Sequence, residues 1–232
     1  MTHILLSRGI LAEPYIHAHL KSYIQPSDKV AVVAFSFFKE HVQTQQDYDA
    51  LYLKDGTYYQ KMVDAFKPYG IQEKQISFLH YYNDDQQTLV KKINDASIIY
   101  FPGGAPDLLM ERIHEKQLFS VIQNQQDKVI VGSSAGAMVQ FDCFHISPDR
   151  EYHKFQYLEG LGFLTGFGIE VHYRRRRKQK SSLRKVRRLK KIPLYAIPDE
   201  GALIIAHNQI KCIKAYQLYN PKGVIRFKGV CI

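Results

Sequence analysis

The stretch of sequence that decides the fold is Val129-Ile130-Val131-Gly132-Ser133-Ser134-Ala135-Gly136-Ala137. An apolar run typical of a strand leads into Gly-x-Ser-x-Gly and then into residues that favour a helix. This order predicts a strand, a sharp turn and a helix, with Ser134 at the apex of the turn. Gly132 and Gly136 are required there, because side chains at both positions would collide with the neighbouring strand and helix. Ser133 should point elsewhere.

Ser134 is therefore a candidate nucleophile, exposed at the carboxyl edge of a sheet. Its hydroxyl would lie near a helix amino terminus, and the amide of Ala135 is placed to stabilise an oxyanion. The pentapeptide alone is a weak signal, since a turn of small residues also lets a helix pack closely on a sheet. The strand before it and the helix after it favour catalysis.

A second glycine turn, Pro102-Gly103-Gly104, also follows an apolar strand and precedes a helix that begins at Pro106. It should lie at the same edge of the sheet. The backbone there can approach a substrate carbonyl closely, so Gly103 or Gly104 could supply a second oxyanion donor. An ordinary connection between a strand and a helix is the alternative interpretation.

Working outward from these turns, short strands alternate with longer amphipathic segments, which is typical of a parallel sheet covered by helices. Strands are predicted at residues 3–6, 29–35, 75–78, 97–101, 128–131, 168–172 and 193–197, and helices at 47–66, 86–94, 106–124 and 181–190. Antiparallel strands are expected after Gly201, including a turn at Asn220-Pro221-Lys222-Gly223. We therefore predict a three-layer α/β sandwich with a mostly parallel central sheet, in which residues 1–232 form a single domain.

A nucleophilic serine needs a general base, and the base needs a group that orients it. His172 ends a predicted strand and so should lie at the carboxyl edge, whereas His145 and His153 are predicted to lie in loops. Two carboxylates could orient His172. Glu200 follows the next predicted strand, and Asp149 lies on a loop after the helix that follows Ser134. For either acid, a solvated turn residue is the simpler interpretation.

The 232 residues are 45% hydrophobic and carry 32 Lys and Arg against 22 Asp and Glu. Twelve of the basic residues lie between Arg174 and Lys191, where there is no acidic residue, so the rest of the chain has a net charge of −2. Three cysteines with no zinc or redox spacing indicate reduced thiols. The apolar run at the amino terminus is too short for a signal peptide or a membrane span, so we expect a cytoplasmic protein with no membrane association.

The sequence motifs around these residues resemble those of the aspartyl dipeptidase (dipeptidase E) and cyanophycinase family of serine peptidases, whose fold is similar to that of class I glutamine amidotransferases. The resemblance follows the order of four motifs, which are Phe101-Pro102-Gly103-Gly104, Gly132-Ser133-Ser134-Ala135-Gly136-Ala137, Leu161-Gly162-Phe163 leading to Ile169-Glu170-Val171-His172-Tyr173, and Ile197-Pro198-Asp199-Glu200-Gly201-Ala202.

The resemblance implies that Ser134 is the nucleophile and His172 the general base, with no metal or organic cofactor. The third residue differs between branches: cyanophycinase-like members favour Glu200, and the dipeptidase assignment favours Asp149. We prefer Glu200. Relatives commonly carry Asn where this chain has Ala105, and an acidic, glycine-containing segment where this chain has Arg174 to Lys178. Substrate choice therefore remains open.

Two hypotheses follow. The first is a serine peptidase of small, acidic peptides, which forms an acyl-enzyme. The second is a catalytically silent binding module of the same fold. The basic segment at 174–191 would attract acidic substrates toward His172, bind nucleic acid, or form a solvated face with Leu183, Val186 and Leu189 turned inward. Nucleic acid is the least favoured of these, and a homodimer is a further expectation.

Overall fold

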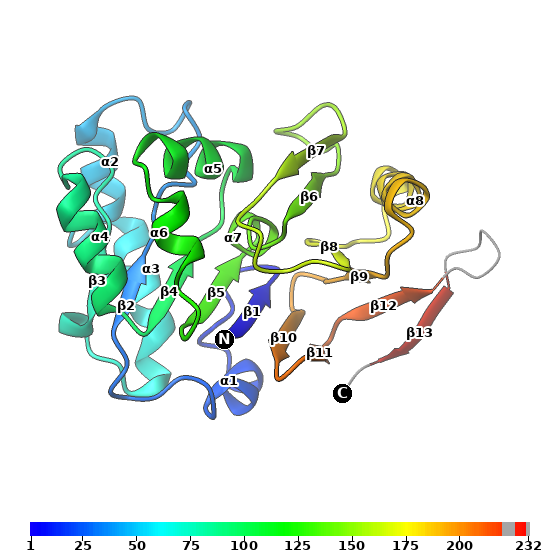
Figure 1. The fold of residues 1–232 in the computed structure, drawn as a ribbon, viewed down its shortest axis with the longest axis horizontal. Helices are drawn as coiled ribbons and strands as arrows, with labels where there is room; N and C mark the ends of the chain where they lie inside the picture. The colour runs from blue at the N-terminus through cyan, green and yellow to red at the C-terminus, as the bar shows by residue number, and fades with distance from the viewer. Residues whose placement is uncertain (220–225, 231–232) are drawn as a thin grey trace.

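The computed structural model describes residues 1–219 and 226–230 (Figure 1). Its largest sheet has seven strands in the order β11-β10-β1-β5-β4-β2-β3. Five of them are parallel, namely β1 (Thr2–Leu6), β5 (Val129–Ser133), β4 (Ile98–Phe101), β2 (Val30–Val32) and β3 (Ile76–Phe78). Two antiparallel strands, β10 (Ala202–Ala206) and β11 (Gln209–Ile213), extend the sheet beside β1. The predicted mostly parallel sheet, with antiparallel strands toward the carboxyl end, is confirmed.

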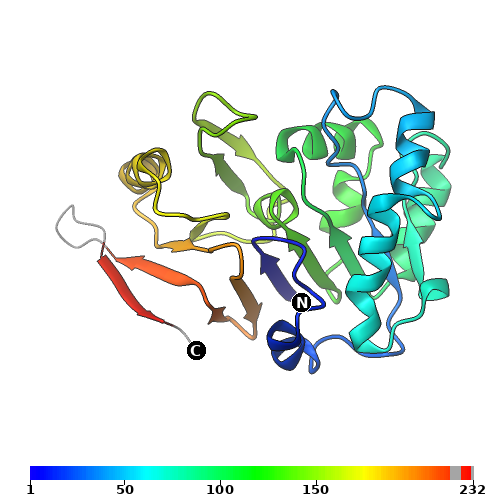
Figure 2. The same ribbon diagram turned by 180° about the vertical axis from the view of Figure 1, so that it is seen from behind.

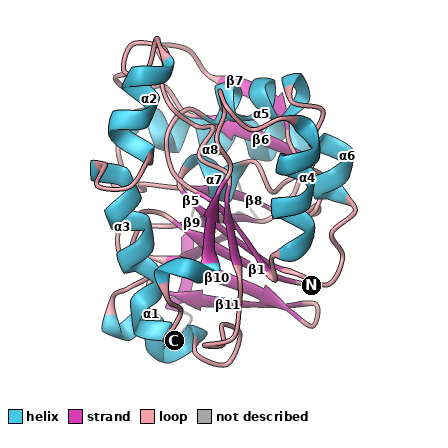
Figure 3. Cartoon of the chain, turned by 90° about the vertical axis from the view of Figure 1, so that its left-hand side faces the viewer, coloured by secondary structure: helices cyan, strands magenta, loops and turns pink. Residues whose placement is uncertain are grey.

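Helices cover both faces of this sheet, which gives the predicted three layers (Figure 3). One layer contains α1 (Pro14–Leu20), α2 (Gln45–Tyr52) and α3 (Thr57–Phe66), and the other contains α4 (Gln86–Asp95), α5 (Pro106–Glu115) and α6 (Phe119–Gln123). Two short 3₁₀ helices lie at Lys67–Tyr69 and Glu73–Gln75.

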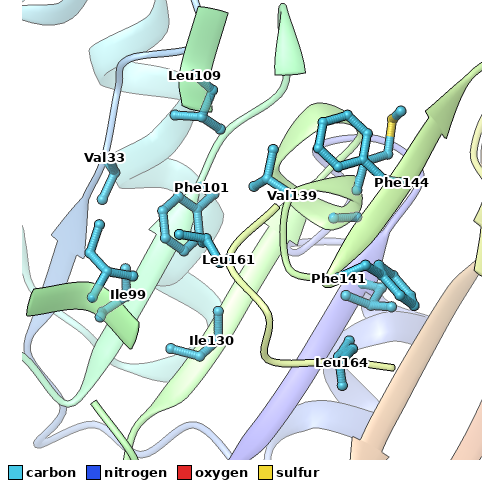
Figure 4. Packing of buried hydrophobic residues seen from close by; sticks show 14 of the residues in the cluster. Val33, Ile99, Phe101, Leu109, Ile130, Val139, Phe141, Phe144, Leu161 and Leu164 are labelled. Carbon is cyan, nitrogen blue, oxygen red and sulfur yellow. The ribbon is translucent and has the colours of Figure 1, made fainter. Parts of the chain in front are cut away.

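The alternation of side chains along each strand supplies two separate apolar cores. In β1, Ile4 and Leu6 face the core shared with α1 to α3, whereas Leu5 faces the core shared with α4 to α6. Figure 4 shows the second core, a buried apolar cluster that contains Ile99, Phe101 and Ile130 of the sheet and Leu109 of α5. Because both faces are covered, the central strands are apolar at nearly every position.

A second sheet of four strands lies beside the first, in the order β13-β12-β9-β8 (Figure 2). It is formed by β8 (Gly168–Glu170), β9 (Leu194–Ala196), β12 (Tyr216–Tyr219) and β13 (Arg226–Val230). The predicted strands at 168–172 and 193–197 therefore pair with each other and not with the central sheet. Their carboxyl ends still reach the edge of the central sheet, because Ser7, just after β1, accepts the backbone N–H of His172 on its Oγ at 2.6 Å.

Helix α8 (Arg177–Lys190) packs on the second sheet through Leu183 and Val186, as predicted. Leu189, predicted to face inward, is 62% exposed. Six residues separate the positions of Leu183 and Leu189, and at about 100° per residue they turn through roughly 600°. Leu189 therefore lies about 120° around the helix from Leu183.

Two predicted helices are divided in the structure. The segment 47–66 breaks at residues 53–56, where Asp55 has a positive φ of 74°, and the segment 106–124 breaks at Gln117, with a φ of 54°. The apolar pattern continues across both breaks because the two halves pack on the same layer.

A hairpin of β6 (Cys143–Ile146) and β7 (Gln156–Glu159) was not predicted, and His145, expected in a loop, lies in β6. The predicted turn at 220–223 and Cys231 lie outside the described residues.

Candidate active site

Ser134 lies between β5 and the four-residue helix α7 (Ala135–Met138), in the predicted strand, turn and helix. Its backbone has φ 51° and ψ −111°, a conformation that costs energy outside glycine. The backbone N–H of Ser134 donates to the carbonyl of Leu6 at 2.8 Å, which holds the turn against β1. A Cβ at Gly132 would lie 2.1 Å from the Gly136 oxygen, and one at Gly136 would lie 1.9 Å from the Phe101 oxygen. Side chains at both glycines would therefore collide with the neighbouring helix and strand, as predicted.

His172 is in contact with Ser134, with 2.9 Å between Ser134 Oγ and His172 Nε2. Strand β8 ends at Glu170, so His172 lies two residues beyond it, with a positive φ of 51°. Besides the bond from its N–H to Ser7, its carbonyl accepts the Gln179 side-chain amide of α8 at 2.9 Å. Two hydrogen bonds from separate elements thus hold the backbone of His172 in a strained conformation.

The carboxylate in contact with the other ring nitrogen is that of Asp199, not Glu200 or Asp149. Its Oδ1 lies 2.7 Å from His172 Nδ1. Its Oδ2 accepts two hydrogen bonds from the Arg174 guanidinium, from Nε at 3.1 Å and from Nη2 at 2.5 Å. Sequence reasoning missed both Asp199 and Arg174, although Asp199 is part of the quoted motif Pro198-Asp199-Glu200-Gly201.

Glu200 is directed elsewhere by the turn that it shares with Asp199. The N–H of Gly201 donates to the carbonyl of Pro198 at 2.8 Å, so Asp199 and Glu200 occupy the two central positions of a tight turn. Glu200 is exposed, and its own carbonyl accepts the hydroxyl of Tyr15. The preference for Glu200 therefore selected the right turn but not the residue whose carboxylate contacts His172.

Asp149 lies in the loop between β6 and β7. Its Oδ1 accepts the backbone N–H groups of Glu151 at 3.0 Å and Tyr152 at 2.7 Å. These bonds stabilise the loop itself, and Asp149 forms no hydrogen bond with His172 within the described part of the chain.

The surroundings of Asp199 favour its ionised form. Burial by itself would raise the pKa of this carboxyl, but the hydrogen bonds from His172 and Arg174 together bring the pKa below its ordinary value. The ionised carboxylate accepts a hydrogen bond from the Nδ1–H group of His172, and in that tautomer Nε2 is free to accept a hydrogen bond from the Ser134 hydroxyl.

The second glycine turn lies beside Ser134, as predicted. A Cβ at Gly103 would lie 3.4 Å from the Cβ of Ser134, and Gly104 has a φ of +144°. Ser36, which is fully buried, holds this turn: its Oγ donates to the Gly103 carbonyl at 2.7 Å, and its carbonyl accepts the N–H of Ala105 at 2.7 Å. Within the described residues, the N–H groups of Gly103, Gly104 and Ala135 have no acceptor, and Gly104 and Ala135 are the two of these that line the cavity at Ser134.

A cavity of about 580 Å³ opens in front of Ser134. The loop between β6 and β7 and the segment from β8 into α8 form much of its wall. Its charged lining residues include the bases Arg174, Arg176, Arg177 and Lys178 and the acids Asp149, Glu151 and Glu170. This volume is in the range of small-molecule pockets.

No cluster of three or more His, Cys, Asp or Glu residues with metal-binding geometry occurs among residues 1–219 and 226–230. In the same part of the chain, every helix is too short or too polar to cross a membrane.

Comparison with known proteins identifies the fold and the family. The sequence matches peptidase family S51 over residues 49–213. A candidate peptidase E from Listeria monocytogenes EGD-e superposes with a TM-score of 0.65 at 16% identity, covering 91% of this chain and 97% of that one. A peptidase from an acI-B1 actinobacterium superposes with a TM-score of 0.68 at 18% identity, covering 98% and 93%. No curated protein sequence matches the chain. Since the family match covers more than two thirds of the sequence, the chain belongs to peptidase family S51 and is a serine peptidase.

Proposed function

We propose that this serine peptidase hydrolyses short acidic peptides through Ser134, His172 and Asp199. The observation that carries the proposal is the continuous chain of contacts from Ser134 Oγ to His172 Nε2, at 2.9 Å, and from His172 Nδ1 to Asp199 Oδ1, at 2.7 Å. A hydroxyl, a base within hydrogen-bond reach and a group that orients the base are the parts that acyl transfer needs.

In the first step, Ser134 Oγ attacks the carbonyl carbon of the scissile peptide bond while its proton passes to His172 Nε2. The N–H groups of Ala135 and Gly104 donate hydrogen bonds to the carbonyl oxygen and stabilise the negative charge that develops on it. The helix that follows Ser134 has only four residues, so these individual amides, and not a long helix dipole, supply the stabilisation. His172 then gives its proton to the leaving amine nitrogen, the C–N bond breaks, and an acyl-enzyme remains.

Water then attacks the acyl-enzyme, transfers one proton to His172 and releases the carboxylic acid as Ser134 recovers its proton. Asp199 stabilises the imidazolium that forms in both halves of the reaction. Arg174 contacts Asp199 Oδ2 and holds the carboxylate with Oδ1 toward His172. The Arg174 guanidinium is thus a positioning group, and its hydrogen bonds go to Asp199 and not to the substrate.

The preference for acidic peptides rests on the remaining bases of the cavity. Arg176, Arg177 and Lys178, at the start of α8, and Arg150, in the loop between β6 and β7, line it, and all four are exposed. Cations around a small cavity attract a carboxylate ligand and raise its local concentration. The predicted attraction of acidic substrates toward His172 is therefore retained as part of the proposal.

A fluorophosphonate probe tests the nucleophile. We expect the protein to be labelled, Ser134→Ala to abolish labelling, and Ser133→Ala, at the neighbouring buried hydroxyl, to retain it. Cleavage of Asp-Leu should exceed that of Asn-Leu, its uncharged counterpart, by roughly tenfold or more in kcat/KM.

Labelling that persists in Ser134→Ala would contradict the proposed nucleophile, and equal cleavage of the two peptides would contradict the substrate class. The catalytically silent binding module predicts no labelling at all. The two departures from the family pattern that favour such a module, Ala105 and the basic segment after His172, leave the contact between Ser134 and His172 in place.

A further inference from the structure

A second group of polar side chains lies in the wall of the same cavity and is not used by the proposed chemistry. Glu170, at the end of β8, is 5% exposed, and its Oε2 accepts hydrogen bonds from two neighbours. His145 Nε2 of β6 lies 2.7 Å from this oxygen, and Ser147 Oγ lies 2.8 Å from it. His145 stacks on Phe155, with an interplanar angle of 21°, so the group is backed by an aromatic ring.

Both hydrogen bonds converge on one oxygen of the carboxylate. The other oxygen, Oε1, has no hydrogen-bond partner in the described part of the chain. Although Oε1 has no partner among these residues, it is not sealed from solvent, and Glu170 lines the cavity. Because Oε1 has no protein donor there and is not sealed from solvent, it is the oxygen of this carboxylate that a donor entering the cavity can reach. Oε1 is therefore left for a ligand that enters the cavity.

We infer that Glu170, oriented by His145 and Ser147, is a subsite for a primary ammonium group of the substrate. This inference rests on the proposed function, because it concerns the same cavity. A carboxylate in a protein wall favours a cationic donor over a neutral one, since charge-assisted hydrogen bonds are about twice as strong. Ser147 is a neutral donor to Glu170 Oε2, and the contacts of Ser147 and His145 with that oxygen leave Oε1 without a protein partner in the described part of the chain.

The position of Glu170 restricts where that ammonium can lie in a peptide. Glu170 and His172 are two positions apart, with Val171 between them, so their Cα atoms are at most about 7 Å apart. A residue of substrate spans about 3.8 Å from one Cα to the next. The ammonium should therefore lie within one or two residues of the scissile bond, either at the amino terminus of a short peptide or on a lysine side chain next to that bond.

Competition with the fluorophosphonate probe tests the subsite without requiring turnover. Three peptides are compared by the concentration that halves the rate of labelling: Asp-Leu, N-acetyl-Asp-Leu and N-acetyl-Lys-Leu. If the subsite takes the amino terminus, Asp-Leu should protect about 10- to 100-fold better than N-acetyl-Asp-Leu. If it takes a side-chain ammonium, N-acetyl-Lys-Leu should have that advantage.

Glu170→Gln keeps an acceptor for His145 and Ser147 but removes the charge. It should abolish the advantage of the ammonium-bearing peptide, and this advantage is a ratio of two peptides measured on the same variant, so it does not depend on how fast that variant is labelled without peptide. Glu151→Gln is the matched control, because Glu151 lines the same cavity but is exposed. It should retain the advantage.

A measurement on the wild-type protein covers the case in which Glu170→Gln does not fold. Raising the pH from 7 to 9.5 deprotonates an α-ammonium, whose pKa is about 8, but leaves most of a lysine ammonium charged. The advantage of Asp-Leu over its acetylated form should therefore fall with a midpoint near pH 8, whereas an advantage of N-acetyl-Lys-Leu should persist. Using the ratio of two peptides cancels titration of the enzyme itself.

The outcomes separate the two proposals. Absence of labelling in wild type contradicts the proposed function. Normal labelling with no advantage for either ammonium-bearing peptide, or an advantage that Glu170→Gln leaves unchanged, overturns the ammonium subsite alone.

Discussion

Replacing Asp199 by Asn tests which of three carboxylates serves His172. The change keeps the size of the side chain but removes the negative charge that lies opposite the imidazolium formed during catalysis. Two opposite charges about 4 Å apart interact by about 4 kcal/mol at the effective dielectric constant of 20 typical of sites near a protein surface. Asp199 is 21% exposed and its Oδ1 lies 2.7 Å from His172 Nδ1, so this intermediate dielectric constant is appropriate.

Loss of about 4 kcal/mol corresponds to a decrease of about 10³-fold in rate. An Asn amide can also orient its NH₂ group toward Nδ1 and select the wrong tautomer of His172, which would increase the loss. We therefore expect Asp199→Asn to lower kcat/KM for Asp-Leu, and the second-order rate of fluorophosphonate labelling, by about 10³- to 10⁴-fold.

The matched controls are Glu200→Gln and Asp149→Asn, which remove one negative charge each from the neighbouring turn position and from the opposite cavity wall. Both should stay within about tenfold of wild type, because neither carboxylate contacts His172. The reasoning is refuted if either control falls as far as Asp199→Asn, or if Asp199→Asn retains more than about a tenth of the wild-type rate.

Three further changes probe the surroundings of the site. Arg174→Ala should lower kcat/KM about fivefold to tenfold, with partial recovery in Arg174→Lys, because the guanidinium is about half exposed and holds Asp199 Oδ2; an unchanged kcat/KM would argue against a positioning role. Gly104→Ala should lower the melting temperature by about 5 °C or more, since its Cβ would lie 1.9 Å from the Ser36 oxygen at a φ of +144°; calorimetry showing an unshifted transition would exclude this strain. The lowered pKa of Asp199 should stabilise the fold above the ordinary carboxyl pKa of about 4, and this contribution is lost as pH falls through the lower folded value. The difference in urea unfolding between wild type and Asp199→Asn should therefore shrink as the pH falls from about 5 to about 3, and a difference that grows over this range would contradict this sign.

The elements around Ser134 could be predicted because their sequence signals are local. Gly132, Gly136 and the run before them specify a strand, a turn and a helix through backbone sterics alone, and the structure contains all three. The same holds for the glycine turn at Gly103 and Gly104. His172 was found by its place near the end of a strand, although that strand pairs in the second sheet.

Asp199 could not be selected over Glu200 from the sequence, because the two residues are adjacent in one turn and share the same sequence context. They differ in the direction of their side chains. Which carboxylate faces His172 depends on how the Pro198–Gly201 turn is oriented relative to the end of β8, and that is set by contacts between distant segments. The hydrogen bond from Tyr15 to the Glu200 carbonyl joins residues 185 positions apart. The hairpin that carries His145 was missed for a related reason, since its strands have only four residues each.

The basic segment from Arg174 to Lys191 is continuous in sequence but divides by contact into three parts. Arg174 is paired with Asp199, Arg176 to Lys178 line the cavity, and within α8 Lys185 and Lys190 lie over the rings of Phe155 and Tyr157 at 4.2 and 5.0 Å. A net charge cannot distinguish these environments, because each depends on what the fold brings opposite the cation. Among the hydrogen bonds of the described residues, Arg174 joins this segment to Asp199 and Gln179 joins it to the His172 carbonyl, and the adjoining cations Arg176 to Lys178 are the ones available to a substrate carboxylate.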